Sequence, residues 1–381
     1  MTKMVGVDVG ATQVRAVEIS GLDTRGFARI TKVGLAPLHR EAVAGGRVKN
    51  PVLVSQALLS ALRTGGMSTY GFVLGLTSPD VAVAQLALPA AVKKPEREAA
   101  IRNRGAELAT TVKLSEGVVS TSLVRTTLSG EGYQLDHMNA AIAKQDEVEG
   151  LKRVCRLVRC NPRALDLSAA ALLRACVRAQ PNDAQVATIV DIGASKVQVI
   201  TREGPHLRSV RTFNGGGTDL TRAIASATSG TVEEAEQMKY RIKVGMSSAP
   251  GPVNLPSAYY GEDAPAPSED LLPQTLVEEA LLKAVDHIVE NIGESIESDA
   301  QDHGGSTTLG ITLTGGSALL GGLKERLSQR LGVPVHIGRP FAVVARGRKT
   351  EMLFRQDGSL DEQVLLSLST AIGLATWREP K

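Results

Sequence analysis

The chain has 381 residues, of which 43% are hydrophobic and 22% charged, a balance typical of a soluble globular protein with two or three domains. Its 43 basic and 40 acidic residues give a net charge of +3, which offers no electrostatic argument for binding nucleic acid or an anionic membrane. Aromatic residues make up only 3%, which argues against a base-stacking surface. No apolar run approaches the roughly 20 residues that cross a bilayer, and no signal-peptide core is visible. We therefore expect a cytoplasmic protein without direct membrane insertion.

The first part of the chain, up to about residue 85, alternates strands and turns around one helix. The stretch "VGVDVGATQVRAVEI", residues 5–19, predicts two strands around a tight turn, and "YGFVLGLT" predicts a buried strand. Between them "NPVLVSQALLSALRTGG" predicts a helix that is capped by Asn50 and ends at Gly65 and Gly66.

Residues 82–160 follow a different pattern, typical of a small inserted αβ domain. "VAVAQLALP" reads as a strand, a charged helix begins at Pro95, and two strands flank the turn "SGEG". The helix that follows carries Val148, Leu151 and Val154 on one apolar face.

A second α/β region begins near residue 186 with "ATIVDIGASKVQVIT", residues 187–201. A helix over 231–245 is predicted from the capping box of Thr231 and Glu234, and residues 246–270 predict a mobile surface loop. A long helix follows, with Val285, Val289 and Ile292 on one face. The strand in "LGITLTGG" should lead into a helix beginning at Ser317, and "EQVLLSLSTAIGLATW" should form the last helix.

Several chemistries find no support in the residue patterns. The three cysteines have no metal-ligand spacing and are expected to be reduced structural thiols. The six histidines are scattered, and neither a P-loop nor a nucleophile elbow is present.

The repeated strand–turn–strand is the most informative feature. Asp8-Val9-Gly10 recurs as Asp191-Ile192-Gly193, which indicates two duplicated α/β domains. Small residues in each turn expose backbone amides that bind phosphate. An aspartate beside a phosphate is favourable if a divalent cation lies between them, so the pattern predicts Mg²⁺ held through water by Asp8 and Asp191.

Further side chains near these turns suit the same ligand. Thr12 and Ser195 offer hydroxyl donors, and Arg15 and Lys196 offer positive charge. A third element, "ITLTGGSALLGGL", places Gly315 and Gly316 after a strand, where backbone can approach a base or sugar. A simple strand–helix junction explains this third element equally well.

Taken together, the three elements resemble the actin/Hsp70/sugar-kinase superfamily, and within it the PilM family of type IV pilus assembly. "DVGATQVRAVEI", "VDIGASK", "GGGTDLTRAIA", "VEEAEQMK" and "LTGGSALLGGLKERLSQRLGVPVHIGRPF" follow that family's order over nearly the whole chain. The resemblance implies an α/β fold of duplicated actin-like (ribonuclease H-like) lobes around a nucleotide cleft, with a small FtsA/PilM-type αβ insertion.

The resemblance also implies a division of the chain. The first lobe would comprise residues 1–81, 161–185 and 346–381, the insertion 82–160, and the second lobe 186–345.

Site residues follow from the resemblance, position by position. Asp8 and Asp191 would hold Mg²⁺ through water, and the remaining residues would surround ATP: Gly10, Ala11, Thr12, Gln13 and Arg15 in the first motif, Gly193, Ala194 and Ser195 in the second, then Gly215, Gly217, Glu236, Lys239, Gly315, Gly316 and Ser317.

Two departures from the family pattern matter. Arg15 stands where a lysine is usual, so the charge is kept with a different geometry. Ser168 stands where relatives have an acidic residue that polarises the attacking water, which leaves Asp166 as the remaining catalytic candidate. We therefore expect ATP binding with slow or no hydrolysis.

Partners are implied by the same resemblance. In PilM-type proteins a groove beside the insertion receives the amino-terminal peptide of PilN, a membrane-anchored protein, so this chain would sit at the inner face of the membrane through that partner and other pilus-assembly proteins. Homo-oligomers, an FtsA-like filament and a small-molecule kinase of the same fold remain alternatives.

Overall fold

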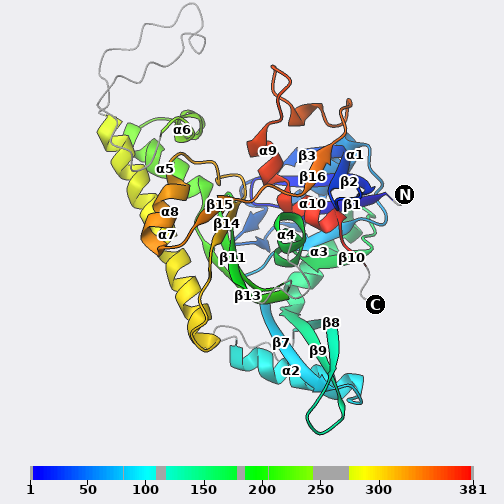
Figure 1. Ribbon diagram of the computed structural model, residues 1–381. Coiled ribbons are helices and arrows are strands. Elements are labelled where there is room, and N and C mark those ends of the chain that lie inside the picture. Colours follow the sequence, from blue (N-terminus) through cyan, green and yellow to red (C-terminus); the bar gives the residue numbers. More distant parts are fainter. Residues whose placement is uncertain are drawn as a thin grey trace, which may run out of the picture.

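The computed structural model describes residues 3–79, 81–108, 117–177, 185–204, 206–242 and 274–378. The loop expected to be mobile, 246–270, lies outside the described residues. Figure 1 shows two sheet-centred bodies, with a smaller sheet projecting from them. Within the described part of the chain, no helix is both long and apolar enough to cross a membrane.

The first body is built on a six-stranded sheet in the order β10-β6-β1-β2-β3-β16. The first three strands, β1, β2 and β3, pair antiparallel. Strand β6 then pairs with β1 in parallel, and β10 pairs with β6 in parallel. The strands are β1 (Met4–Val9), β2 (Gln13–Leu22), β3 (Ala28–Pro37), β6 (Val73–Leu76), β10 (Ala164–Leu167) and β16 (Ala342–Val344). The first lobe was expected to resume at residue 346. The chain returns to this sheet slightly earlier, because β16 pairs with β3 over residues 342–344.

The second body repeats this topology. Its five-stranded sheet has the order β13-β12-β11-β14-β15, with three antiparallel strands followed by two parallel additions beside β11. The strands are β11 (Val186–Ile192), β12 (Lys196–Glu203), β13 (His206–Asn214), β14 (Ile311–Thr314) and β15 (Val335–Ile337). The duplication predicted from the two hairpins is confirmed by the matching strand order.

The projecting part is a three-stranded antiparallel sheet in the order β7-β9-β8. It consists of β7 (Val81–Pro89), β8 (Val118–Leu128) and β9 (Gln134–Ala143), with α2 (Lys94–Leu108) packed on it. Its strand β7 lies beside β13, where the Gln85 amide donates to the Leu207 carbonyl at 3.2 Å. A two-stranded sheet is formed by β4 (Val43–Ala44) and β5 (Arg47–Val48).

Helix ends follow local sequence signals closely. The Asn50 side chain accepts from the Val52 and Leu53 amides, and Gly66 ends α1 in the left-handed conformation. The capping box of Thr231 and Glu234 is present at α6. The helices are α1 (Pro51–Gly65), α3 (Gln145–Leu157), α4 (Ser168–Cys176), α5 (Gly217–Thr228), α6 (Val232–Lys239), α7 (Gln274–Asp302), α8 (Leu323–Leu331), the 3-10 helix η3 (Glu351–Leu353), α9 (Glu362–Ser367) and α10 (Ser369–Ala375).

Three helix predictions were wrong in extent. The helix expected at Ser317 begins at Leu323, because turns follow Gly315 and the left-handed Gly322 immediately precedes the first helical residue. The helix expected over 231–245 ends at Lys239. The last helix is two helices, α9 and α10, which meet at Leu368.

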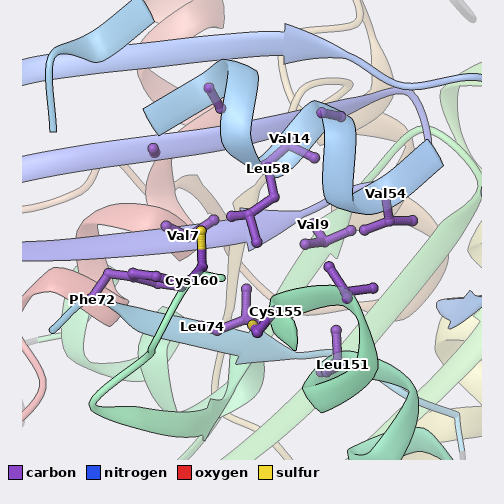
Figure 2. Close-up of a cluster of buried hydrophobic side chains, with 14 of the residues drawn as sticks. Val7, Val9, Val14, Val54, Leu58, Phe72, Leu74, Leu151, Cys155 and Cys160 are labelled. Carbon is purple, nitrogen blue, oxygen red and sulfur yellow. The ribbon is translucent and has the colours of Figure 1, made fainter. Parts of the chain in front are cut away.

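The first body's core lies between its sheet and the helices α1 and α3. Figure 2 shows Val7 and Leu74 of the sheet with Leu58 of α1, close to Cys155 and Cys160. The three cysteines are free and buried. Burial raises the pKa of the Cys155 and Cys176 thiols to about 12, which agrees with the expectation of reduced structural thiols.

Helices α4 and α10 lie between the two sheets. Leu172 of α4 packs against Ile189 and Ile200 of the second sheet, while α10 packs against β1 and α4. The contact between the helices is close: a side chain at Gly373 would overlap the Ala171 carbonyl, and one at Gly6 would overlap the Ala371 carbonyl.

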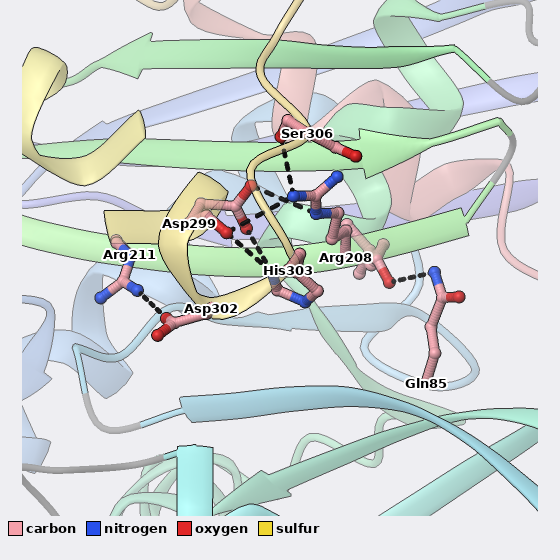
Figure 3. A network of polar contacts seen from close by, with 8 residues as sticks. Gln85, Arg208, Arg211, Asp299, Asp302, His303 and Ser306 are labelled. Carbon is pink, nitrogen blue, oxygen red and sulfur yellow. Dashed lines mark hydrogen bonds and ion pairs between the residues drawn. The ribbon is translucent and has the colours of Figure 1, made fainter. Parts of the chain in front are cut away.

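A buried ion pair joins β13 to the end of α7 (Figure 3). Arg208 Nε lies 3.2 Å from the Asp299 carboxylate, and the two side chains are only 2% and 3% exposed. The guanidinium also donates to the Ser306 carbonyl at 2.9 Å, and His303 Nδ1 lies 2.8 Å from the Asp299 carbonyl. The neighbouring Arg211–Asp302 pair, at 2.6 Å, is far more exposed.

We predict that Arg208→Met lowers the free energy of unfolding by about 3–5 kcal/mol, because it leaves the buried Asp299 carboxylate without its arginine partner. Urea denaturation measures this, with Arg211→Met as the matched control, for which we expect a change below about 1 kcal/mol. The double variant Arg208→Met/Asp299→Leu should recover much of the loss. Equal effects of Arg208→Met and Arg211→Met would contradict the burial argument.

Candidate functional site

The two hairpins end in turns of the same construction. The Gly10 amide donates to the Gln13 carbonyl at 3.0 Å, and the Gly193 amide donates to the Lys196 carbonyl at 3.0 Å. Both turns lie at the rim of one cavity of about 550 Å³, which we call the cleft. The repeated motif therefore brings two clusters of small residues to a single concave site.

Most of the residues predicted from sequence line this cleft. They are Asp8, Gly10, Ala11, Thr12, Gln13, Arg15, Asp191, Gly193, Ala194, Ser195, Gly217, Glu236, Lys239, Gly315, Gly316 and Ser317. Gly215 is not in the wall: its amide donates to the Ser195 carbonyl at 3.3 Å, so it supports the second turn from behind. The individual roles of these residues stay predictions.

The turns of the second body hold one another through backbone contacts. The Gly217 amide donates to the Gly193 carbonyl at 2.9 Å, and the Thr218 amide donates to the Ala194 carbonyl at 2.8 Å. A side chain at Gly216 would come within 2.5 Å of the Gly193 carbonyl, and its φ of 141° is one that L residues avoid. Glycine at this position thus permits a close approach that no other residue allows.

Four charged groups gather at the base of the cleft. Arg15 Nη1 lies 3.4 Å from the Asp8 carboxylate, opposite which it stands in the strand register. Burial raises the pKa of the Asp191 carboxyl to about 6; Lys196 and Arg15 oppose that shift and Asp8 adds to it. Burial lowers the pKa of the Lys196 ammonium, while Asp8 and Asp191 raise it. The two carboxylates and two cations therefore act on one another, and their formal charges sum to zero.

Two buried donors in the cleft are left without partners. Neither Ser195 Oγ nor Arg15 Nε has a hydrogen-bond partner within the described part of the chain. A buried polar atom that lacks a partner costs free energy, so a ligand that accepts hydrogen bonds would be favoured there. An anion such as phosphate has the required acceptor oxygens.

The other end of the cleft is formed by α6. Lys239 Nζ is buried and donates to both oxygens of Glu236, at 2.8 and 2.7 Å, and to Thr221 Oγ1 at 3.0 Å. Burial lowers the pKa of the Lys239 ammonium, and Glu236 raises it. The Tyr240 hydroxyl donates to the Gly316 carbonyl at 3.1 Å, which joins α6 to the glycine turn after β14.

Asp166, the catalytic candidate, does not line the cleft. Its carboxylate pairs with Arg174 and accepts from the Leu167 amide at 2.9 Å, and it lines a second cavity. The Ser168 hydroxyl is buried and lies 2.5 Å from that of Thr77, which does line the cleft. The expectation that Asp166 activates water in the cleft is therefore wrong for this arrangement, because its carboxylate lines the second cavity and pairs with Arg174.

Sequence reasoning missed several residues of the cleft wall. Lys196 was noted only as nearby charge, and Thr77, Gln198, Thr218, Tyr240, Gln363, Val364, Ser367 and Thr370 were not identified. Tyr240 directly follows the last residue of α6, so the predicted pair Glu236 and Lys239 could have pointed to it. The residues of α9 and α10 give no such signal, because only the tertiary fold brings them to the site.

The second cavity, which we call the groove, has a volume of about 970 Å³. It lies between the three-stranded sheet and the first body. Val118 and Thr121 of β8 form one wall, Leu173 and Arg174 of α4 another, and Trp377, the single tryptophan of the sequence, contributes from the end of the chain. Its wall is mainly apolar.

Comparisons with known proteins agree with this architecture. A solved PilM-PilN type IV pilus biogenesis complex contains a chain that matches 98% of this chain over 97% of its own, with 21% identity and a TM-score of 0.70. The ethanolamine utilization protein EutJ from Carboxydothermus hydrogenoformans matches 98% of this chain over 89% of its own, with 14% identity and a TM-score of 0.50.

Family-level matches are more specific than these structural ones. A comparison with curated proteins gives no match. The family described as cell division protein FtsA matches residues 188–351. The family described as type IV pilus assembly protein PilM matches residues 6–249, which is more than half of the chain. The chain belongs to the PilM family of type IV pilus assembly proteins, which have an actin-like ATPase fold.

Proposed function

We propose that this PilM-family chain binds ATP in the cleft and serves as an assembly platform, holding the amino-terminal peptide of a PilN-type membrane protein in the groove. The observation that supports the nucleotide most directly is the cleft itself. Three segments far apart in the sequence meet there, with two amide-rich turns at one end and a glycine turn at the other.

The phosphate chain of ATP suits the end with the two hairpins. The turns at Gly10 and Gly193 contain small residues, which give a phosphate close access to backbone amides. Ser195 Oγ and Arg15 Nε add two buried donors whose hydrogen-bonding capacity is unused. The adenosine would then extend toward Gly316, with Lys239 and Tyr240 on one side.

The predicted Mg²⁺ fits the cleft less well than the nucleotide. Asp8 lies beside the Arg15 guanidinium, and Lys196 raises the positive charge near both carboxylates. Arg15 and Lys196 offset the charge of the two carboxylates, so these carboxylates attract a divalent cation less than an unpaired pair would, and we assign no step to a metal.

Slow or absent hydrolysis is part of the proposal. The family resemblance implies that Ser168 takes the place of an acidic residue, and its hydroxyl bonds to another hydroxyl, that of Thr77. Neither group is a base that could take a proton from water unaided. Bound ATP would then act by stabilising one arrangement of the two bodies rather than by turning over.

The groove is the observation that favours a peptide partner. Its apolar wall suits an extended peptide, and the neighbour of similar fold was solved as a PilM-PilN complex. Binding through such a peptide would hold the protein at the inner face of the membrane through its partner, without an inserted segment of its own. A filament and contacts with other pilus-assembly proteins stay predictions.

We predict that Gly316→Leu weakens ATP binding at least about tenfold, a loss the size of one strong polar contact. A Cβ atom added at Gly316 meets nothing within 4 Å in the protein, so a side chain can start from this position into the cleft. Calorimetric titration of ATP measures the effect. Gly347→Leu, also in open space but outside the cleft, is the control. Unchanged affinity in Gly316→Leu would place the nucleotide elsewhere.

We also predict that a synthetic peptide copying the amino-terminal segment of the PilN-type protein from the same genome alters the fluorescence of Trp377. The change should saturate with peptide concentration, because this tryptophan lines the groove. Ala141→Arg, which places a charge in the groove wall, should weaken binding at least about tenfold. Leu123→Arg, on exposed surface of the same sheet, is the control and should bind normally. Equal binding by both variants would count against the groove.

A further inference from the structure

The two hairpins differ in where they carry positive charge, although their backbones are equivalent. Asp8 stands opposite Arg15 in the first, and Asp191 stands opposite Gln198 in the second. The residue that begins the second strand of each hairpin is Gln13 in the first and Lys196 in the second. An amide and a cation have thus exchanged places between two copies of one motif.

This exchange places the cation of the second hairpin at Lys196, the first residue after the turn, where it lines the cleft. Lys196 lines the cleft together with Asp8 and Asp191, and its charge interacts with both carboxylates. The Arg15 guanidinium, in contrast, is held against Asp8 at 3.4 Å. Within the described residues Lys196 Nζ makes no hydrogen bond and no ion pair within 4.0 Å, so its N–H groups are available to a ligand while its charge acts on Asp8 and Asp191.

A cation between two carboxylates and a phosphate chain performs the electrostatic task expected of Mg²⁺. It compensates the repulsion between Asp8, Asp191 and the bound anion, and it donates hydrogen bonds to phosphate oxygens. Opposite Asp191 the strand pair places Gln198, whose amide is neutral and donates to Thr212 Oγ1 at 3.3 Å. Lys196 is therefore the cation that the second hairpin supplies.

We propose that Lys196 takes the place of the divalent cation in this cleft, so that the chain binds ATP equally well with and without Mg²⁺. The proposal rests on the proposed binding of ATP and goes beyond it, since it assigns the neutralising charge to a residue of the chain. On this proposal the ligand of the cleft is a nucleoside triphosphate without a bound metal ion.

The test is calorimetric titration of ATP into the full chain, once with excess EDTA and once with excess Mg²⁺. For the natural protein we expect dissociation constants that agree within about threefold. Lys196→Gln makes the second hairpin match Gln13 of the first. It should weaken binding in EDTA at least about tenfold, as loss of a charge-assisted contact does, and restore a requirement for Mg²⁺.

Two further variants keep the result interpretable. Lys196→Arg retains the charge and should preserve binding in EDTA. Lys324→Gln removes the same charge from the exposed surface of α8 and should change nothing. Circular dichroism melting of each variant shows whether it is folded.

The remaining outcomes overturn the proposal. If the natural protein binds ATP only with Mg²⁺, Lys196 does not replace the metal, although the proposed nucleotide site survives. If Lys196→Gln weakens binding equally in both conditions, Lys196 is an ordinary phosphate contact beside the metal. If no ATP binds in either condition, the nucleotide site itself is wrong and the proposal falls with it.

Discussion

The backbone carbonyls of the second hairpin are the contact on which the candidate site depends. Those of Ile192, Gly193 and Ala194 accept, in turn, from the amides of Ser317, Gly217 and Thr218. Two turns from different parts of the chain, one before α5 and one after β14, are thereby fixed to one hairpin. Such contacts demand glycine at Gly216 and Gly315, where any side chain would meet these carbonyls. The backbone contacts therefore fix the shape of the site, and the side chains determine its charge.

Charge within that frame is arranged differently in the two copies of the motif. In the first hairpin a cation faces the aspartate across the strand pair, and in the second it stands at the mouth of the turn. Because both aspartates lie at the base of one cleft, each cation acts on both. The duplication thus supplies two similar backbones whose side chains have diverged to share one electrostatic task.

Much of the fold could be predicted from the sequence, because its strongest signals are local. The hairpins, the cap at Asn50 and the capping box at Thr231 depend on residues a few positions apart, and the structure confirms them. Predictions that depended on distant parts of the chain were weaker. Asp166 was the acidic candidate that the family resemblance left, yet its carboxylate lines the groove and pairs with Arg174. Gln363 and Thr370 reach the cleft only because α9 and α10 return to it.

The return of α10 has a consequence for genetics. Thr370 lines the cleft, whereas Ile372 and Thr376 line the groove, and six residues of helix span only about 9 Å. The helix is also wedged against Gly6 and Ala171, which leaves it little room to shift. Substitutions in this short segment will therefore be pleiotropic. A defect caused by such a substitution can come from either cavity. A second-site suppressor on β8 would point to the groove, and one on the hairpins would point to the cleft.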